Sequence, residues 1–151
     1  MEASTNATLA PVVKRIAVPC SCERAFELFT AGIANWWPLS THSVGRDNAA
    51  CCMIEPRSGG RIFETGKDGT EHDWGKVLAW EPPHRLAFTW HPGGEADSAQ
   101  TVEVTFTRDG AGAVLTLEHR DWHRLGERAP KVRKSYDQGW DAVLDHYRAA
   151  A

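Results

Sequence analysis

Several short segments of the chain alternate apolar with polar residues. In the clearest one, residues 101–108, Val102, Val104 and Phe106 alternate with Thr and Glu. A period of two places alternate side chains on opposite faces of a strand, so this segment predicts a strand with one apolar face. Together with the turn residues between segments, the pattern predicts seven strands, at residues 12–18, 51–55, 61–65, 72–80, 85–90, 101–108 and 113–121. Because short turns join most of these strands, we expect antiparallel pairing.

A helical repeat occurs near both ends of the chain. Residues 24–30 and 33–37 predict two short helices after the first strand, with Ser21 as the N-cap of the first. Residues 130–149 predict one long helix, whose apolar side chains fall within an arc of about 80°. These side chains are Val132, Tyr136, Trp140, Val143 and Tyr147. Strands in one block with helices set apart indicate an α+β fold, in which the long helix covers one face of a curved sheet.

Two further features of the long helix carry expectations. Gly139 lies on the apolar arc, where the absence of a side chain would allow close packing on the sheet. On the polar side, Lys134 is placed to pair with Asp137 or Asp141. The segment at 38–50 is a long polar loop, a kind of segment that is often functional.

Length and charge narrow the class of protein. With 151 residues, the chain is predicted to form a single domain at 12–149 after a flexible tail at 1–11. The formal net charge of −3 argues against a nucleic-acid-binding protein, which should show a basic face. No apolar run reaches the roughly 18 residues of a membrane helix, so membrane insertion is not expected. Since the first residues resemble no leader sequence, we expect a cytoplasmic protein.

Metal and cofactor signals are weak. Cys20, Cys22, Cys51 and Cys52 lack the Cys-x2-Cys spacing of zinc sites, so half-buried thiols in a reducing compartment are the simpler interpretation. Glu64, His72 and Asp73 flank a turn and could together hold Zn²⁺ or Fe²⁺, although such clusters are usually solvated. No nucleotide-binding or hydrolase motif is present, and we expect no metal and no cofactor.

In the predicted strand at 113–121, the residues that face inward are apolar at first and polar at the end. Ala113, Leu115, Leu117, His119 and Asp121 share one parity. A histidine beside a carboxylate is a candidate general acid or base, so His119 and Asp121 are the candidate catalytic residues. The alternative is a histidine that is structural or faces solvent.

Five segments together resemble a known family. They are residues 75–90 (GKVLAWEPPHRLAFTW), residues 18–29 (VPCSCERAFELF), Trp36-Trp37-Pro38, residues 58–61 (SGGR), and Gly139-Trp140 followed by Leu144. In order and spacing they resemble the activator of heat-shock-protein-ninety ATPase homologue family, of the C-terminal-domain type, within the START-like, Bet-v-like (SRPBCC) superfamily. The resemblance covers about residues 12–149. It implies a helix-grip fold, in which a seven-stranded antiparallel sheet curls around the C-terminal helix and leaves a cavity.

The resemblance also implies a role in binding a small apolar or amphipathic molecule. The candidate ligand-binding residues are Trp36, Trp37, Phe63, Phe88, Trp90, Val104, Phe106, Leu115, Leu117, His119, Trp140 and Leu144. Core packing is the alternative for each. Two other functions stay open: a cyclase or dehydratase that uses His119, and a protein-interaction module of the chaperone-activator kind. The chaperone-activator role is disfavoured, because the eukaryotic namesake carries an additional N-terminal domain for which 151 residues leave no room. An exposed strand edge would support a homodimer.

Overall fold

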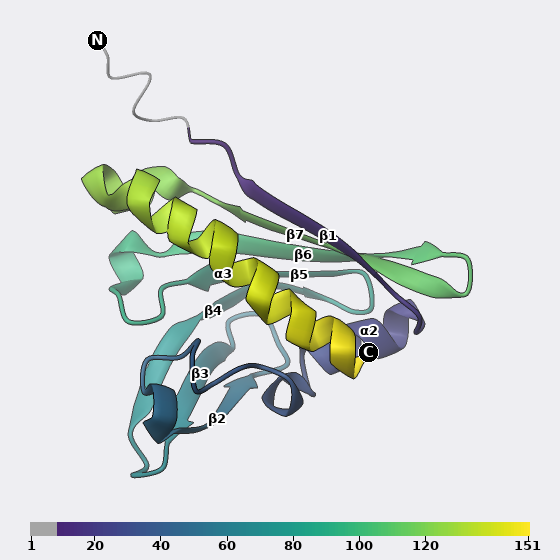
Figure 1. The fold of residues 1–151 in the computed structure, drawn as a ribbon, viewed down its shortest axis with the longest axis horizontal. Helices are drawn as coiled ribbons and strands as arrows, with labels where there is room; N and C mark the ends of the chain where they lie inside the picture. Colours follow the sequence, from purple (N-terminus) through teal and green to yellow (C-terminus); the bar gives the residue numbers. More distant parts are fainter. Residues whose placement is uncertain (1–8) are drawn as a thin grey trace.

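Seven antiparallel strands form one curved sheet in the computed structural model, which describes residues 9–151. The strand order is β1-β7-β6-β5-β4-β3-β2, as expected for a helix-grip fold (Figure 1). The strands are β1 (Val12–Val18), β2 (Ala49–Ile54), β3 (Arg61–Gly66), β4 (Glu71–Glu81), β5 (Arg85–Trp90), β6 (Gln100–Asp109) and β7 (Gly112–Arg120). All seven strands predicted from the alternation are present. Each pairs with its neighbours as the short turns require.

Helices follow the first strand and end the chain. Helix α2 (Cys22–Phe29) begins after Ser21, whose hydroxyl accepts a hydrogen bond from the Arg24 amide at 3.1 Å. The second short helix is a single 3-10 turn, η1 (Ile33–Asn35). Helix α3 (Ala129–Ala150) has Pro130 in its first turn, where a missing N–H costs nothing. Three further 3-10 segments are η2 (Arg46–Asn48), η3 (Ala96–Ser98) and η4 (Trp122–Arg128).

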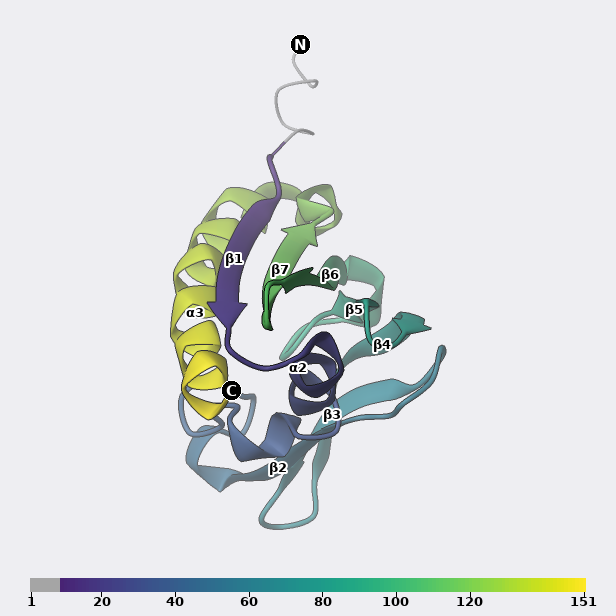
Figure 2. The ribbon, with the colours of Figure 1, turned by 90° about the vertical axis from the view of Figure 1, so that its right-hand side faces the viewer.

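Helix α3 packs along the concave side of the sheet. Figure 2 shows the sheet curling from β1 round to β2, with α3 beside β1 and α2 at one end. The apolar stripe of α3 is buried at Trp140, Val143, Leu144 and Tyr147. The Tyr147 hydroxyl donates to the Ala25 carbonyl at 2.7 Å, which joins the two helices.

An ion pair joins the first strand to the last helix. Lys14 Nζ lies 2.6 Å from Asp137 Oδ1 and 3.0 Å from Asp141 Oδ1. These carboxylates were expected to pair with Lys134, but the inward parity of β1 brings Lys14 to them instead. Arg133 Nε also donates to the Ala10 carbonyl at 2.6 Å. The end of the expected tail is therefore attached to α3, while residues 1–8 lie outside the described part of the chain.

The sheet bends where its pairing is irregular. The register shifts between β3 and β4 at Ile62/Phe63, and a bulge increases the local twist of a strand. At Gly75, a Cβ atom would lie 1.8 Å from the Thr89 carbonyl oxygen of β5. Only glycine permits this close approach of two strands.

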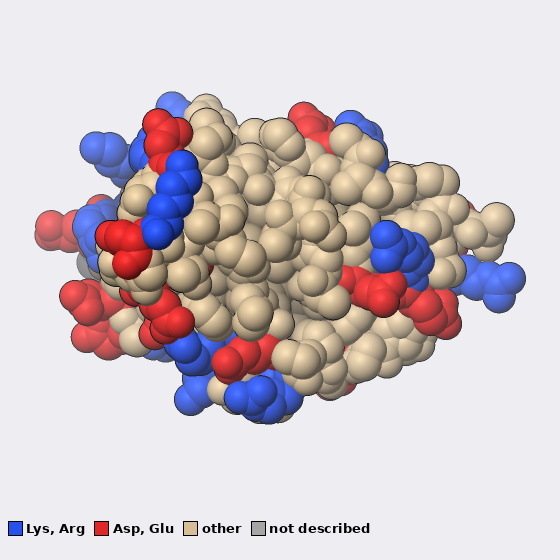
Figure 3. Space-filling model, turned by 90° about the horizontal axis from the view of Figure 1, so that it is seen from below, with Lys and Arg blue, Asp and Glu red and all other residues tan. Residues whose placement is uncertain are grey.

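The convex face of the sheet is polar, as expected for an antiparallel sheet with one wetted side. Arg120 Nη1 lies 2.8 Å from Glu103 and 2.7 Å from Glu118, so neighbouring strands carry a row of ion pairs. Seen from the side of β2 and β3, groups of both signs lie toward the two ends of the molecule (Figure 3). Across residues 9–151, no helix has the length and apolar character needed to cross a membrane.

Candidate ligand-binding site

A cavity of about 610 Å³ lies between α3, the loop at 38–48 and the loop that follows β5. Pockets that hold small ligands generally have volumes of about 300–1,000 Å³. Trp37 precedes the loop at 38–48, and both contribute to the lining. Trp90 comes from β5, and α3 contributes residues between Lys131 and Val143. The cavity is therefore at one end of the fold and not along the whole length of the helix.

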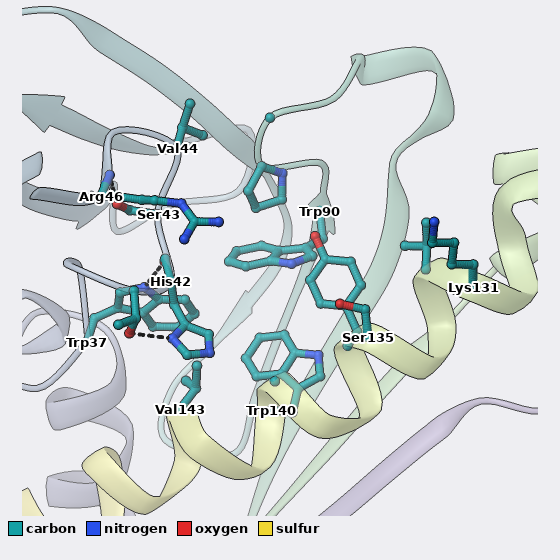
Figure 4. A pocket seen from close by; sticks show the side chains of 16 residues that line it. Trp37, His42, Ser43, Val44, Arg46, Trp90, Lys131, Ser135, Trp140 and Val143 are labelled. Atoms are coloured by element: carbon teal, nitrogen blue, oxygen red, sulfur yellow. Dashed lines mark hydrogen bonds between the residues drawn. The ribbon is translucent and has the colours of Figure 1, made fainter. Parts of the chain in front are cut away.

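Three indole rings make the apolar wall of this cavity: Trp37, Trp90 and Trp140 (Figure 4). Their ring centroids lie 5.6 to 6.0 Å apart. Two of the rings are fixed by their N–H groups. Trp37 donates to the His42 carbonyl at 2.7 Å, and Trp140 donates to His119 Nδ1 at 3.0 Å. The ring planes are inclined to one another by 36° to 86°, so the wall is a rigid aromatic surface with several faces.

The third indole leaves a donor unused. Among the described residues, the buried N–H of Trp90 has no partner that meets hydrogen-bond geometry. Tyr136 is beside it: burial raises the pKa of the Tyr136 phenol to about 12, and the Trp90 N–H opposes this shift. The Trp90 N–H is therefore a buried group whose neighbour is the Tyr136 hydroxyl.

Charged groups around the cavity are all basic. Arg46 and Lys131 contribute to the lining, and no Asp or Glu from the described part of the chain does so. Arg46 has a positive φ of 49°, a backbone conformation that costs energy for a residue other than glycine. Its guanidinium extends over the cavity toward Trp90 (Figure 4). The arrangement therefore favours a ligand with negative charge.

A histidine is also part of this wall. The ring of His42 is half-buried, and its Nδ1 lies 2.8 Å from the Thr41 hydroxyl. Burial, followed by the nearby His146 and Arg46, lowers the pKa of His42 below its ordinary 6.5. The imidazole is consequently neutral at pH 7.

A buried carboxylate fixes the loop that carries these residues. Glu64 of β3 is fully buried and accepts hydrogen bonds from the amides of Val44 and Gly45 at 2.6 and 2.9 Å. The Trp74 indole donates to the same carboxylate at 2.6 Å. Charge-assisted bonds of this kind are about twice as strong as neutral ones, so Glu64 holds the cavity wall in place.

The structure divides the predicted ligand-binding residues into three groups. Trp37, Trp90 and Trp140 line the cavity. A second group belongs to the hydrophobic core and is outside the lining of the cavity: Trp36, Phe88, Val104, Phe106, Leu115, Leu117 and Leu144. Phe63 belongs to neither group. It lies on the opposite face of β3 from Ile62 and Glu64, with the Arg61 guanidinium 4.1 Å from the centre of its ring.

His119 faces inward as its parity predicts, but it does not pair with Asp121. Its Nε2 lies 3.1 Å from Gln100 Oε1, and its Nδ1 accepts from Trp140. Asp121 lies beyond the end of β7 with a φ of 70°, and its carboxylate accepts from the Thr101 hydroxyl at 2.6 Å. The left-handed backbone at Asp121 breaks the alternation on which the expected pair depended. His119 positions Trp140, and neither of its nitrogens reaches the cavity.

The suggested metal cluster is also separated by the fold. Glu64 is buried beneath the loop, whereas Asp73 is exposed and pairs with Arg61 at 2.8 Å. Within residues 9–151, no group of three His, Cys, Asp or Glu residues could hold a metal ion. All four thiols are free, and burial raises the pKa of Cys52 to about 12.

Sequence reasoning missed the polar part of the cavity. His42, Arg46, Lys131 and Ser135 line it, yet periodicity carries no information about a loop or about the edge of a helix. Two signals were present: the length and polarity of the loop at 38–50, and Gly139 on the apolar arc of α3. Gly139 does not pack against the sheet. An added Cβ there would lie 3.9 Å from His42 Nε2, so the glycine forms part of the cavity floor.

Comparisons with known proteins agree with this architecture. Residues 19–150 match the profile of a family described as Activator of Hsp90 ATPase homolog 1-like protein. A solved structure of an anthrahydroquino-Gama-pyrone synthase, Txn09, complexed with SUM, is 38% identical, covering 85% of this chain and 88% of that chain with a TM-score of 0.60. Among curated proteins, none matches significantly.

Two more distant structures show the same fold. Protein MLL2253 from Mesorhizobium loti is 18% identical, with a TM-score of 0.66 and coverage of 92% of this chain and 94% of that chain. The Aha1 dimer from Colwellia psychrerythraea is 16% identical, with a TM-score of 0.66 and coverage of 94% and 96%.

Proposed function

This chain belongs to the family of Activator of Hsp90 ATPase homolog 1-like proteins, and we propose that it binds a flat aromatic ligand with a negative charge. The observation that carries the proposal is the composition of the cavity wall. Three indole rings provide aromatic area, and within residues 9–151 the charged lining residues are Arg46 and Lys131. A ligand of this class would stack on the rings and place its anionic group toward the cations.

Similarity supports the aromatic part of the proposal. The relative at 38% identity is an anthrahydroquino-Gama-pyrone synthase, a name that denotes a fused aromatic ring system. Its alignment covers 85% of this chain.

Isothermal titration with two matched probes tests this function. Anthraquinone-2-carboxylate is charged, whereas anthraquinone-2-carboxamide has the same shape and no charge. We expect the carboxylate to bind about tenfold more tightly, because a charge-assisted bond contributes about 1.5–3 kcal/mol. Arg46→Gln should remove most of that difference.

Filling the cavity provides the second half of the test. Gly139→Leu projects a side chain toward His42 and should abolish binding of both probes. Gln138→Leu changes the neighbouring exposed position of the same helix and is the matched control. Equal binding to both variants, or no binding of either probe to the unaltered protein, would contradict the proposal.

Catalysis on the bound ring is a second candidate function, favoured by the synthase named among the similar structures. The test starts from native mass spectrometry of the freshly purified protein, which identifies any retained molecule. That molecule is then extracted and incubated with the emptied protein, and chromatography follows its conversion. Recovery of the molecule unchanged would mean that the protein binds it without converting it. A homodimer, a chaperone contact and a cytoplasmic location stay predictions.

A further inference from the structure

The ring of His42 occupies a position from which it can contact a ligand. In the view of Figure 4 it lies between Trp37 and Trp140. Its Nε2 faces the space left by Gly139, at 3.9 Å from where a Cβ would be. Within residues 9–151, no protein group hydrogen-bonds to this nitrogen. The ring therefore presents an unused nitrogen to the cavity.

Thr41 provides a partner for one nitrogen of His42. The Thr41 hydroxyl lies 2.8 Å from His42 Nδ1, and it also lies 3.4 Å from the Pro38 carbonyl, to which it can donate. A neutral imidazole carries one hydrogen, and in the tautomer with that hydrogen on Nδ1 the Thr41 oxygen accepts it. In this tautomer Nε2 has a lone pair directed into the cavity.

The charges around His42 favour the neutral ring, which is the form that can accept a proton. Arg46 comes from the same loop, His146 lies on α3, and Lys131 lines the cavity farther along the helix. No carboxylate in the lining would stabilise an imidazolium. Arg46 and Lys131 are already protonated and cannot accept a proton. Among the lining residues, His42 is consequently the one neutral base.

We propose that His42 accepts a proton from an acidic hydroxyl, a phenol or an enol, of the bound aromatic ligand. This inference rests on the proposed function. In the step, the ligand O–H bond breaks, its electron pair stays on oxygen, and a new N–H bond forms at Nε2. The oxyanion then faces Arg46, and its charge balances the imidazolium. No oxidant, reductant or further reactant is needed. His42 would be the catalytic residue of any reaction that begins from this oxyanion.

The test uses 2-hydroxyanthraquinone, whose visible absorption changes when its hydroxyl ionises. Spectra are recorded at saturation, about two pH units below the pKa of the free probe, so that affinity does not affect the result. With the unaltered protein we expect the spectrum of the ionised probe and no net release of protons. Proton release is measured from titration heats in two buffers of different ionisation enthalpy.

His42→Gln should give one of two results: the spectrum of the neutral probe, or ionisation with about one proton released to the buffer. Thr41→Val leaves the imidazole in place but removes the acceptor at Nδ1, and it should lower the ionised fraction. The same spectrum and the same proton balance in His42→Gln as in the unaltered protein would overturn the proposal. A neutral probe in the unaltered protein would also overturn it.

A separate probe distinguishes failure of this inference from failure of the proposed function. The methyl ether 2-methoxyanthraquinone has no proton to lose. If it binds the unaltered protein while the hydroxyl probe stays neutral, the cavity binds aromatic rings and His42 is not the acceptor. If neither compound binds, the proposed function itself is wrong, and this inference fails with it.

Discussion

His119 is an uncharged hydrogen-bonding group at the centre of the aromatic core. It stacks on Trp122 with ring centroids 4.1 Å apart and bridges Gln100 to Trp140. Since Nδ1 accepts from the Trp140 indole, Nε2 carries the proton and donates to Gln100. Protonation would put a second hydrogen on Nδ1, opposite the indole N–H. The hydrogen bonds and the burial both favour the neutral ring.

This residue should make the protein sensitive to mild acid. Burial lowers the pKa of His119 to about 3 in the folded protein, whereas its ordinary value is 6.5. Between these values the unfolded chain binds more protons, so the free energy of unfolding falls as the pH falls from 6.5 toward 3. The slope for one group is about 1.4 kcal/mol per pH unit. We expect His119→Gln, which keeps an acceptor and a donor, to flatten this slope between pH 6.5 and 5, as measured by urea unfolding.

The window between pH 6.5 and 5 lies above the ordinary pKa values of carboxylates, so it separates the effect of His119 from theirs. His123→Gln serves as the control, because His123 is exposed and should leave the slope unchanged. A slope that is equally steep in His119→Gln would mean that other groups cause the acid sensitivity.

For single residues, the sequence predicted the face of the sheet on which a side chain lies better than the groups that the side chain contacts. Alternation correctly placed His119 and Leu117 on the inner face, because strand parity is a property of the backbone. It could not show the left-handed residue that turns Asp121 away. Phe63 has the opposite parity from Ile62, and its aromatic character alone made it a candidate.

Among the elements, the loop at 38–48 depends on β3 for its shape. Two of its backbone amides donate hydrogen bonds to the Glu64 carboxylate. An added Cβ at Gly45 would lie 3.2 Å from that carboxylate. The loop has little regular structure of its own apart from η2. Glu64 therefore anchors the middle of the loop, and the Trp37 indole holds it at the His42 carbonyl.

Replacing that side chain should loosen the loop. Glu64→Gln keeps one acceptor oxygen but turns an amide NH₂ toward N–H groups that need an acceptor. An unsatisfied buried donor costs about 1–3 kcal/mol, and we expect a loss of this size in urea unfolding. Hydrogen exchange at Val44 and Gly45 should become faster. Glu71→Gln, at an exposed ion pair, should cost less than about 1 kcal/mol. Equal losses in the two variants would show that Glu64 does not anchor the loop.

For the molecule as a whole, the two ends of the described chain meet. β1 pairs with β7, and Lys14 of β1 also reaches Asp137 and Asp141 of α3 (Figure 2). The Lys14 side chain is 18% exposed, so its ion pairs are less screened than those at the surface. We therefore expect the first strand to unfold together with the last helix.

A double-mutant cycle measures this connection. Lys14→Met, Asp137→Asn and the combined variant are compared by urea unfolding. We expect a coupling energy of about 0.5–1 kcal/mol, because Asp137 is half exposed and Asp141 stays as a second partner. The coupling should decrease at 1 M salt. The cycle of Lys134→Met with Asp137→Asn is the comparison, and a larger coupling there would contradict the geometry.

The overall architecture was accessible from sequence because it depends on repeating patterns. Seven alternating segments, short turns and one long amphipathic stripe are sufficient to specify the sheet and the helix that covers it. The cavity was only partly accessible. Its aromatic wall follows from that pattern, but Arg46 and His42 are brought to it by a loop whose path depends on Glu64.

Gly139 has a consequence for how the family could diversify. Because the position lies on the cavity floor and contacts no strand, each carbon added there shortens the space beneath His42 and leaves the sheet intact. Alanine, serine or valine at this position would accept progressively thinner or shorter molecules. One codon can thus change ligand selectivity without cost to the scaffold, so proteins with nearly identical folds can hold different compounds.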